Sequence, residues 1–453
     1  MTTFQCGTLN DVISLVIDYR GKTPKKLGSD WSNSGYRALS AKNIKTGQIV
    51  QPETIRYVDQ SLYTKWMKDE IQRGDILITS EAPFGQVLFW DSDEKIVLSQ
   101  RIFGLRVKEN FCPAYIYYYM TSSDFQYELD SRATGTTVTG LRQPELLKCK
   151  ICYPDKKQQE QIAKILCKID NKISLNTAIN NNLEQQAQAL FKSWFIDFEP
   201  FGGTRPKDWE QVTLENCTDL ISRGYNTKYV EKSQLLNLNQ KANRGSFIEK
   251  KHYKYLDESI PVPAERFAKK GDVLVNSMGV GTIGRTHYWN SEDANTVVDQ
   301  CITIVRYKPN VTTGEFLYLL LTSSEYVSYI EQHITGSTGM VSLNISAVRD
   351  CNIFLPKWDV LESFHNFVSP LYEKIENNVA ENERLAAIRD ALLPKLMSGE
   401  IDVSKVDISD PSYLDKLLFS EVFKKNANGR FFIAYISKYI ICTFDKNLGI
   451  IIY

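Results

Sequence analysis

The feature that most limits how this chain can fold is a stretch at residues 158–198 that contains neither proline nor glycine. Its apolar residues recur at steps of three and four, as in an amphipathic helix with a coiled-coil-like seam. They are Ile162, Leu166, Ile169, Ile173, Leu183, Ala187, Leu190 and Trp194. At 1.5 Å per residue such a helix would be roughly 60 Å long. This length exceeds the interior of an ordinary domain, so the pattern predicts a spacer between domains.

A second apolar stripe of the same kind closes the chain's other half. Its members are Leu361, Phe364, Val368, Leu371, Ile375, Leu385, Ile388 and Leu392. The two stripes match at a constant offset of 202, and each is interrupted by asparagines at the same place, at 176 and 180 in the first and at 378 and 382 in the second. Two unrelated surface helices would not share a polar step at one offset. The stripes therefore indicate an internal duplication.

The globular segments before each helix repeat as well. Strand-like alternation at 75–79, 86–90 and 102–107 is followed by a short helix near 113–120 and a closing strand at 148–153. R-G-D-I-L at 73–77 returns as K-G-D-V-L at 270–274, V-L-S-Q at 97–100 as V-V-D-Q at 297–300, and T-G-T-T at 134–137 as T-G-S-T at 335–338. The fold class predicted is α+β, a tandem duplication of a mixed α/β domain plus a long helix.

This duplication predicts five segments along the chain. They are a first domain at 1–155, a central spacer helix at 156–200, a second domain at 201–356, a C-terminal spacer helix at 357–402 and an extra tail at 403–453. The order domain, helix, domain, helix allows the two helices to pack antiparallel, with the domains at opposite ends. The tail has no counterpart in the first half. Strand-like runs at 430–436 and 439–444 suggest a hairpin there, to which no function is assigned.

Composition narrows the functional classes. The chain has 453 residues with 54 basic and 54 acidic side chains, so whole-molecule charge does not drive polyanion binding, although local basic surfaces remain possible. Neither a membrane-length apolar run nor a signal peptide is evident. Nine irregularly spaced cysteines, an odd number, predict free thiols in a reducing cytoplasm.

Two nucleotide-binding patterns are incomplete. Gly21-Lys-Thr23 resembles the end of a phosphate-binding loop, but Val16 stands where that loop needs another glycine. G-V-G-T-I-G at 279–284 matches a dinucleotide fingerprint, yet a strand-like run follows it instead of a helix. A loop near a DNA backbone or a tight hairpin explains this segment better.

Catalytic and metal motifs are also incomplete. Cys149 and Cys152 form a lone C-x-x-C, whereas zinc needs a second pair, so both are predicted to be structural. The four histidines are scattered without a histidine–carboxylate cluster. D-P-S-Y at 410–413 lacks the second proline of the amino-methyltransferase motif, and a turn is the better interpretation. The sequence therefore predicts no catalytic residue and no metal site.

Both halves instead carry loops rich in Arg, Lys, Asn, Ser and Thr among aromatic residues. Side chains of these kinds can contact phosphate oxygens and base edges of DNA. The candidate DNA contacts are Arg20, Lys22, Lys42, Asn43, Ser80, Gly135, Thr136 and Thr137 in the first half and Arg223, Tyr225, Asn239, Gln240, Asn276, Ser277, Gly336, Ser337 and Thr338 in the second. Taken alone, a loop of this composition is more often simply exposed to solvent than bound to DNA. Its occurrence in both halves of the duplication strengthens the prediction of DNA contact.

Over residues 1–402 the chain resembles the DNA-specificity subunit of a type I restriction-modification system. The resemblance rests on the repeated strand and turn motifs, on the helix start Q-Q-E-Q-I at 158–162, and on the helix ends L-F-K-S-W at 190–194 and L-L-P-K-L-M-S-G-E at 392–400. It implies two target-recognition domains, each reading half of a split DNA site, held apart by an antiparallel helix pair. It also implies methylation subunits docked on that pair and, in some systems, a motor-nuclease subunit.

The hypothesis is therefore a non-catalytic, cytoplasmic specificity subunit that reads a bipartite site in double-stranded DNA. It would bind no cofactor itself, since S-adenosylmethionine, ATP and Mg would be bound by its partners. Two alternatives remain open: a self-contained DNA methyltransferase or nuclease with fused recognition domains, and a two-domain protein-binding scaffold. The DNA target and the length of its unread gap do not follow from the sequence.

Overall fold

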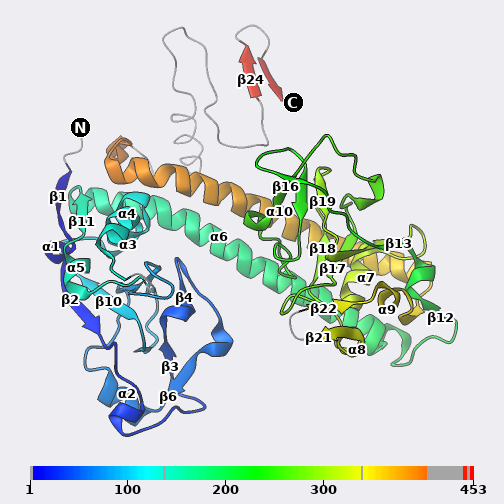
Figure 1. The fold of residues 1–453 in the computed structure, drawn as a ribbon, viewed down its shortest axis with the longest axis horizontal. Coiled ribbons are helices and arrows are strands. Elements are labelled where there is room, and N and C mark those ends of the chain that lie inside the picture. Colours follow the sequence, from blue (N-terminus) through cyan, green and yellow to red (C-terminus); the bar gives the residue numbers. More distant parts are fainter. Residues whose placement is uncertain (1–3, 136–138, 338–339, 406–441, 446–448, 453) are drawn as a thin grey trace. The chain divides into compact units, whose positions relative to one another are not determined.

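The computed structural model describes residues 4–135, 139–337, 340–405, 442–445 and 449–452 (Figure 1). The chain forms two compact units. Unit 1 combines the chain up to Ile173 with the chain from Glu383 onward, and unit 2 takes Ser174–Asn382. Both long helices contribute to both units, so the domain bounds derived from the sequence stay predictions.

The central sheet of unit 1 has four antiparallel strands, in the order β2 (Ile13–Asp18), β10 (Ile102–Val107), β7 (Ile76–Thr79) and β8 (Val87–Phe89). Alternate residues of β7 serve different cores, because successive side chains of a strand point to opposite faces. Ile76 and Ile78 join the core beneath the helices, whereas Leu77 joins a core on the other face. The sheet is thus buried on both faces.

Helices cover one face of this sheet, and small strands cover the other. The helices are α3 (Pro113–Thr121), α4 (Ser123–Arg132), α5 (Gln143–Leu147) and parts of the long helices α6 (Lys156–Phe191) and α10 (Trp358–Ser398). The opposite layer contains β6 (Arg56–Val58), β3 (Tyr36–Leu39), β9 (Val97–Leu98) and helix α2 (Gln60–Trp66). The short elements α1 (Leu9–Val12), β4 (Ile44–Lys45) and β5 (Gln48–Ile49) complete the unit.

A disulfide corrects the prediction that all the cysteines are free thiols. Strand β1 (Gln5–Thr8) pairs antiparallel with β11 (Lys150–Tyr153), and the register places Cys6 directly opposite Cys152. The two Cα atoms are 4.1 Å apart and the sulfurs are bonded. Sequence spacing could not reveal this pair, because the residues are 146 positions apart. Cys149, the other member of the C-x-x-C, is buried and unbonded, in agreement with a structural role.

Unit 2 repeats the architecture. Its four-stranded sheet has the order β13 (Thr218–Arg223), β20 (Ile302–Tyr307), β17 (Asp272–Asn276) and β18 (Thr286–Trp289). Its second sheet has the order β14 (Tyr229–Val230), β16 (Lys254–Leu256), β15 (Leu236–Leu238) and β19 (Thr296–Val298). The remaining elements are β12 (Glu210–Thr213) paired with β23 (Asn352–Leu355), the hairpin of β21 (Ile334–Ser337) and β22 (Met340–Leu343), and helices α7 (Gly314–Leu321), α8 (Ser324–His333) and α9 (Ile345–Arg349). The tandem duplication is confirmed.

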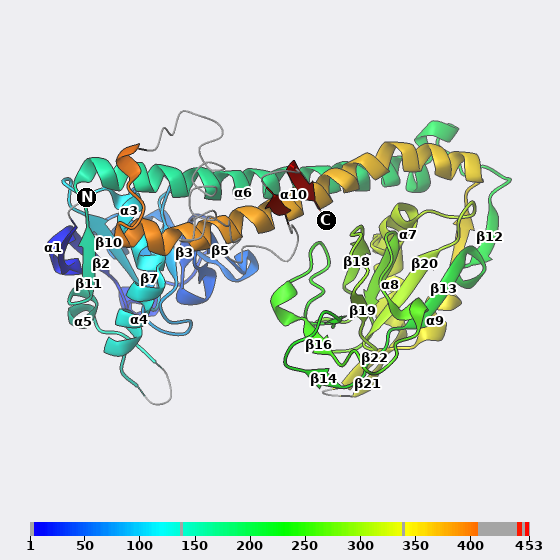
Figure 2. The same cartoon turned by 90° about the horizontal axis from the view of Figure 1, so that it is seen from above.

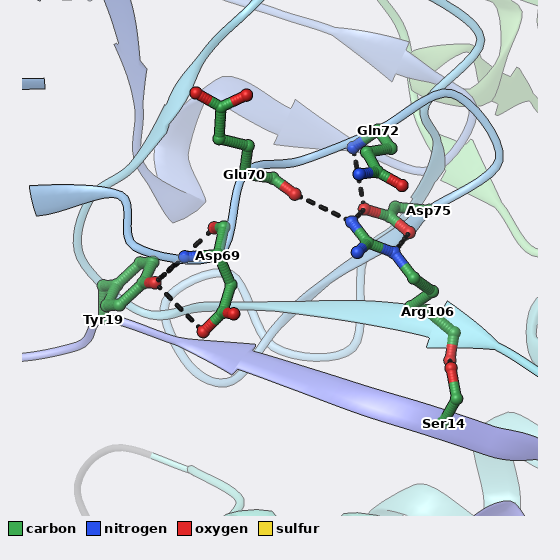
Figure 3. Close-up of polar contacts among 7 residues, drawn as sticks. All are labelled: Ser14, Tyr19, Asp69, Glu70, Gln72, Asp75 and Arg106. Atoms are coloured by element: carbon green, nitrogen blue, oxygen red, sulfur yellow. Dashed lines mark hydrogen bonds and ion pairs between the residues drawn. The ribbon is translucent and has the colours of Figure 1, made fainter. Parts of the chain in front are cut away.

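The aspartate of the repeated G-D motif forms a buried ion pair with an arginine in each unit. Arg106 forms two hydrogen bonds with the carboxylate of Asp75, at 3.0 and 2.8 Å, and a third with the carbonyl of Glu70 at 2.7 Å (Figure 3). In unit 2, Arg306 contacts Asp272 in the same way, at 2.8 and 2.7 Å. Each pair joins the start of one central strand to its neighbour. Breaking a buried pair of this kind typically costs about 3–5 kcal/mol.

The long helices pack antiparallel within each unit. In unit 1, Arg389 of α10 forms an ion pair with Asp170 of α6 at 2.8 Å. In unit 2, Tyr372 of α10 donates to Glu184 of α6 at 3.4 Å. From the first contact to the second, the residue number rises on α6 and falls on α10, so the helices run in opposite directions. Helix α6 continues into a π-helical turn at Lys192–Ile196. The antiparallel, coiled-coil-like helix pair is therefore confirmed.

A polar group in unit 2 connects the globular part to α10. Tyr288 of β18 donates to the buried carboxylate of Glu315 on α7 at 2.9 Å, and His365 of α10 contacts the same carboxylate at 3.1 Å. Figure 2 shows α7 between the sheet and the long helices. The contact with Glu315 raises the pKa of His365. Burial alone would raise the pKa of Glu315, but the hydrogen bonds from His365 and Tyr288 lower it.

The asparagines of the apolar stripes meet across the helices. Asn378 donates to the side-chain oxygen of Asn180 at 2.7 Å, and Asn176 donates to Glu381 at 2.7 Å and to Asn382 at 2.9 Å. Asn176 and Asn378 are 1% exposed, so their side chains lie in the seam between the helices and not in solvent. A polar step in an apolar seam favours one register, because a slip of the helices would break these hydrogen bonds between side chains.

The tail agrees only partly with its prediction. Strand β24 (Cys442–Asp445) pairs antiparallel with β25 (Gly449–Ile452), so a hairpin is present. The run at 430–436 that was expected to provide one strand lies outside the described residues. A bilayer-spanning helix is absent from the described part of the chain.

The His365–Glu315 contact predicts a pH dependence of stability. The protonated His365 contributes fully below its unfolded pKa of about 6.5, and this contribution is lost as the pH rises through the raised folded pKa. Ionised Glu315 contributes above about 4.5, and its contribution is lost as the pH falls through the lowered folded pKa. The pair is therefore strongest between about pH 4.5 and 6.5.

We expect the Tm of the wild-type protein to fall more between pH 6 and 8 than that of His365→Gln. Thermal melts across this range measure the difference. His333→Gln is a matched control, because His333 contacts the carbonyl of Tyr329 instead of an acid. Parallel pH curves for wild type and His365→Gln would contradict the prediction.

The asparagine step predicts opposite effects for partial and complete replacement. Asn378→Leu should lower stability by about 1–3 kcal/mol, because it leaves the half-buried side-chain oxygen of Asn180 without its donor. Leucine at positions 176, 180, 378 and 382 together should raise the Tm but loosen register or assembly. Denaturant titration and size-exclusion chromatography provide the measurements. The exposed Asn181→Leu is the control, and a quadruple variant less stable than Asn378→Leu would refute the register role.

Candidate nucleic-acid interface

Three chain segments meet at one end of the four-stranded sheet in each unit. In unit 1 the amide of Ser80 donates to the carbonyl of Arg101 at 2.8 Å, and the amide of Leu141 donates to the carbonyl of Ser80 at 3.0 Å. In unit 2, Ser277 donates to Cys301 and Leu343 donates to Ser277, both at 2.9 Å. We call these assemblies the loop ends: residues 80–86, 99–101, 134–135 and 139–141 in unit 1, and 277–285, 299–301, 334–337 and 340–343 in unit 2.

An arginine near the end of the first central strand joins each loop end. Arg20 Nη1 donates to the carbonyl of Leu141 at 3.3 Å, and Arg223 Nη2 donates to the carbonyl of Leu343. The two leucines are equivalent, because each donates to the serine that follows the central strand. The structure therefore brings Arg20 together with Ser80, and Arg223 with Ser277, as parts of one site in each unit.

The two arginines differ in charge compensation. Arg20 forms a bidentate contact with Asp18, at 2.9 and 2.8 Å, and its guanidinium carbon lies 3.8 Å from the ring centre of Phe103. Arg223 forms no ion pair with a carboxylate among the described residues, and its Nη1 is buried without a hydrogen-bond partner. Burial lowers the pKa of Arg223, which a nearby Cys301 only partly opposes. The positive charge of Arg223 is thus the less satisfied of the two.

The other candidate contacts of unit 1 lie in several places. Lys22 donates to the carbonyl of Trp66 at 2.9 Å, and Lys42 is exposed. Asn43 is buried and donates to Thr54 Oγ1 at 2.9 Å, which is a structural role. Gly135 is exposed in the loop end. Thr136 and Thr137 lie outside the described residues.

In unit 2 most of the candidates gather, but several face inward. Asn276 and Ser277 are fully buried, and Asn276 donates to the carbonyl of Gln240 at 3.0 Å. Asn239 donates to the carbonyl of His252 at 2.5 Å, and Tyr225 is half-buried. These contacts stabilise the loops internally, so the buried side chains would reach DNA only after a rearrangement.

The β21–β22 hairpin contains the last group of candidates. Gly336 and Ser337 lie on β21, and Thr338 lies outside the described residues. An isolated bridge between Met278 and Ser342 ties this hairpin to the glycine-rich loop at 279–284. That loop connects two antiparallel strands, β17 and β18, as the absence of a following helix indicated. All seventeen assignments stay predictions of DNA contact.

Some surface groups at the loop ends were missed by the sequence patterns. Arg101 is exposed and has a left-handed backbone, with φ of 67°, and it forms an ion pair with Glu81 at 2.9 Å. Gln100 and Gln300 are exposed at the same turn of each unit. The sequence contained a signal for these glutamines. In the repeated motifs V-L-S-Q and V-V-D-Q the third residue differs, whereas the glutamine is the same in both halves. Within the described residues, no group of His, Cys, Asp or Glu side chains could hold a metal ion.

Comparisons with known proteins agree with this architecture. Residues 1–185 match the family model of the type I restriction modification DNA specificity domain. The specificity subunit of the type I restriction enzyme MjaIX from Methanocaldococcus jannaschii is 28% identical over 357 residues, covering 74% of this chain and 79% of the relative. The HindI specificity subunit from Haemophilus influenzae is 24% identical over 403 residues, covering 74% and 88%.

One solved structure is similar in fold. The S subunit of a type I restriction-modification system from M. genitalium superposes with a TM-score of 0.56 at 15% identity. The superposition covers 87% of this chain and 96% of that structure. At this level of identity the comparison bears on the fold alone, and it supports the repeated domain-plus-helix architecture.

The unequal compensation of the two arginines predicts unequal effects on stability. Arg20→Met should lower the free energy of unfolding by about 1–2 kcal/mol, because it leaves the half-buried carboxylate of Asp18 unpaired. Arg223→Met should change it by less than about 0.5 kcal/mol or raise it, since a half-buried cation is removed whose Nη1 has no hydrogen-bond partner. Denaturant unfolding measures both, with the exposed Arg142→Met as control. A larger loss for Arg223→Met would contradict this account of the site.

Proposed function

We propose that this chain, as a DNA-specificity subunit of a type I restriction-modification system, binds a bipartite DNA target through two modules, one for each loop end. The observation that carries the proposal is that both units have the same backbone arrangement at the loop end but different side chains around it. Ser80 and Ser277 hold equivalent positions, whereas the loops around them differ in length and composition. Modules of this kind would read two different short sequences and leave the DNA between them unread.

The chain is the non-catalytic component of such an enzyme. Methyl transfer and cleavage would belong to partner subunits, which would bind S-adenosylmethionine, ATP and Mg. Phosphate contacts from lysine and arginine would position the duplex, and polar side chains at the loop ends would contact base edges. The complex would act on cellular DNA in the cytoplasm.

Methylation subunits would dock on the helix pair, and a motor-nuclease subunit could join them. Support comes from the outward faces of α6 and α10, which expose the large apolar residues Leu175 and Phe367. Long helices of this kind offer an extended surface that the globular parts of each unit do not cover. Docking there would leave both loop ends accessible to DNA.

The test is a map of methylated bases in cells that produce this chain with its methylation partner. We expect a split motif with two defined half-sites, which is absent when the chain is omitted. Replacing residues 204–356 with the same block from a relative should change one half-site and leave the other unchanged. Methylation without this chain, or changes in both half-sites, would overturn the modular model.

A further inference from the structure

A basic segment beside the loop end of unit 2 continues the candidate loop that begins at Asn239 and Gln240. Between positions 241 and 254 the chain has five basic side chains and one acidic side chain, whereas the whole chain has 54 of each. The basic residues are Lys241, Arg244, Lys250, Lys251 and Lys254, and the acidic residue is Glu249. The local excess is therefore 5 − 1, or four positive charges, in a molecule without net charge. We call residues 241–254 the basic hairpin.

The single acid organises the basic groups. Arg244 contacts Glu249 at 2.7 Å, and Lys251 contacts the other oxygen of the same carboxylate. His252 lies 3.3 Å from Glu249 as well. Hydrogen bonds from Lys251 and Arg244 lower the pKa of Glu249 to about 2. One carboxylate thus orients several donors at the surface but compensates only part of their charge.

The turn of the basic hairpin is rigidly held. The side chain of Asn243 is fully buried, donates to the carbonyl of Leu274 at 3.1 Å and accepts from the amide of Gly245 at 2.8 Å. His287 Nδ1 lies 2.7 Å from the carbonyl of Gly245. Burial lowers the pKa of His287 to about 4, so the ring is neutral at pH 7 and adds no charge. The backbone closes where the amide of Arg244 donates to the carbonyl of Phe247 at 3.0 Å.

This turn exposes a large aromatic ring. Phe247 is 52% exposed, although the chain before and after it is anchored in the core. In the sequence this ring lies between Arg244 and Lys250. In DNA-binding proteins, an apolar side chain that lies between lysines or arginines packs against sugars and nucleobases. The lysines and arginines contact the phosphates.

The basic hairpin adjoins the loop end through direct contacts. Asn276, the last residue of β17, donates to the carbonyl of Gln240. A Cβ placed on Gly279 would lie 3.6 Å from the side chain of Gln240. Asn243 donates to the carbonyl of Arg285, just before the edge strand β18, at 3.4 Å. DNA bound at the loop end of unit 2 would therefore pass close to the hairpin.

Unit 1 has the corresponding hairpin without these groups. Strands β4 and β5 pair beside the edge strand β8, and the turn between them is Thr46-Gly47. Thr46 contacts Gln86, and the amide of Gly47 donates to the carbonyl of Val87 at 3.0 Å. This turn carries no aromatic side chain. Of the two hairpins, which both carry lysines, that of unit 2 has the exposed phenylalanine and the larger number of basic side chains.

We propose that the basic hairpin is a DNA-backbone clamp for the second half-site. In this role Lys251 and Lys254 contact phosphates, while Phe247 packs on deoxyribose and base surface in the groove between them. The inference rests on the proposed function and extends it, because it names the contact that supplies sequence-independent affinity in one half only. Charge complementarity favours duplex DNA as the occupant.

The experiment uses the chain assembled with its methylation partner. The probe is a labelled duplex that carries the methylated motif found by the genome map, titrated between 50 and 200 mM salt. Each lost phosphate contact should reduce the slope of log K against log salt by about 0.9. We expect Lys251→Gln with Lys254→Gln to reduce it by about 1.8 and to weaken binding roughly 5-fold per lysine near physiological salt.

The phenylalanine should behave differently from the lysines. Phe247→Ala should weaken binding roughly tenfold with the salt slope unchanged, whereas Phe247→Tyr should bind like the wild type. The methylated motif should remain the same in every variant, because no base-reading loop is altered. Lys207→Gln and Phe354→Ala, at exposed positions outside the hairpin, are the matched controls. A thermal melt of each variant excludes unfolding as the cause.

Three outcomes would overturn the clamp. Wild-type affinity and salt slope in all hairpin variants would show that the segment does not contact DNA. Loss of the methylation partner from the variant complex would identify the hairpin as a protein-docking surface instead. Failure of the wild-type complex to bind any duplex would refute the proposed function itself, and the clamp with it.

Discussion

The structure depends on the apolar contact between the two long helices. The helical core of unit 1 includes Ile162 and Ile169 from α6, but Leu385, Ile388 and Leu392 of α10 complete it. Unit 2 is completed in the opposite sense, by Ala187 and Phe191 of α6 packing with the first half of α10. Neither half of the chain can therefore bury its core alone. Each unit therefore buries apolar residues from both long helices in its own core.

The seam also explains why polar residues are tolerated in it. An apolar stripe with a repeat of three and four allows several registers of similar energy, and burial alone does not choose between them. The hydrogen bond between Asn378 and Asn180 favours the observed register, because a slip of the helices would separate the two side chains. The contact of Asp170 with Arg389 acts in the same way in unit 1. Polar contacts thus supply specificity while the apolar residues supply most of the stability.

On this base, each unit builds a rigid sheet and a variable surface. The buried pairs of Asp75 with Arg106 and of Asp272 with Arg306 are repeated nearly atom for atom, as are the backbone bonds at the loop ends. The charges around them are not repeated. Arg20 is neutralised by a carboxylate and Arg223 is not, and the hairpin turns carry different side chains. Duplication therefore preserved the scaffold and left the surface chemistry of the two units independent.

The sequence by itself determined the helices, the duplication and the central strands, because these depend on local periodicity and on motifs that recur at a constant offset. It also located the loops that gather at the sheet ends. Only the tertiary structure decided which side chains face inward: Asn276 and Ser277 are buried, although their composition suggested a surface loop. The Cys6–Cys152 bond and the partners of the G-D motifs were likewise undetermined. Each depends on which distant strands become neighbours, and that is set by the burial of the whole core.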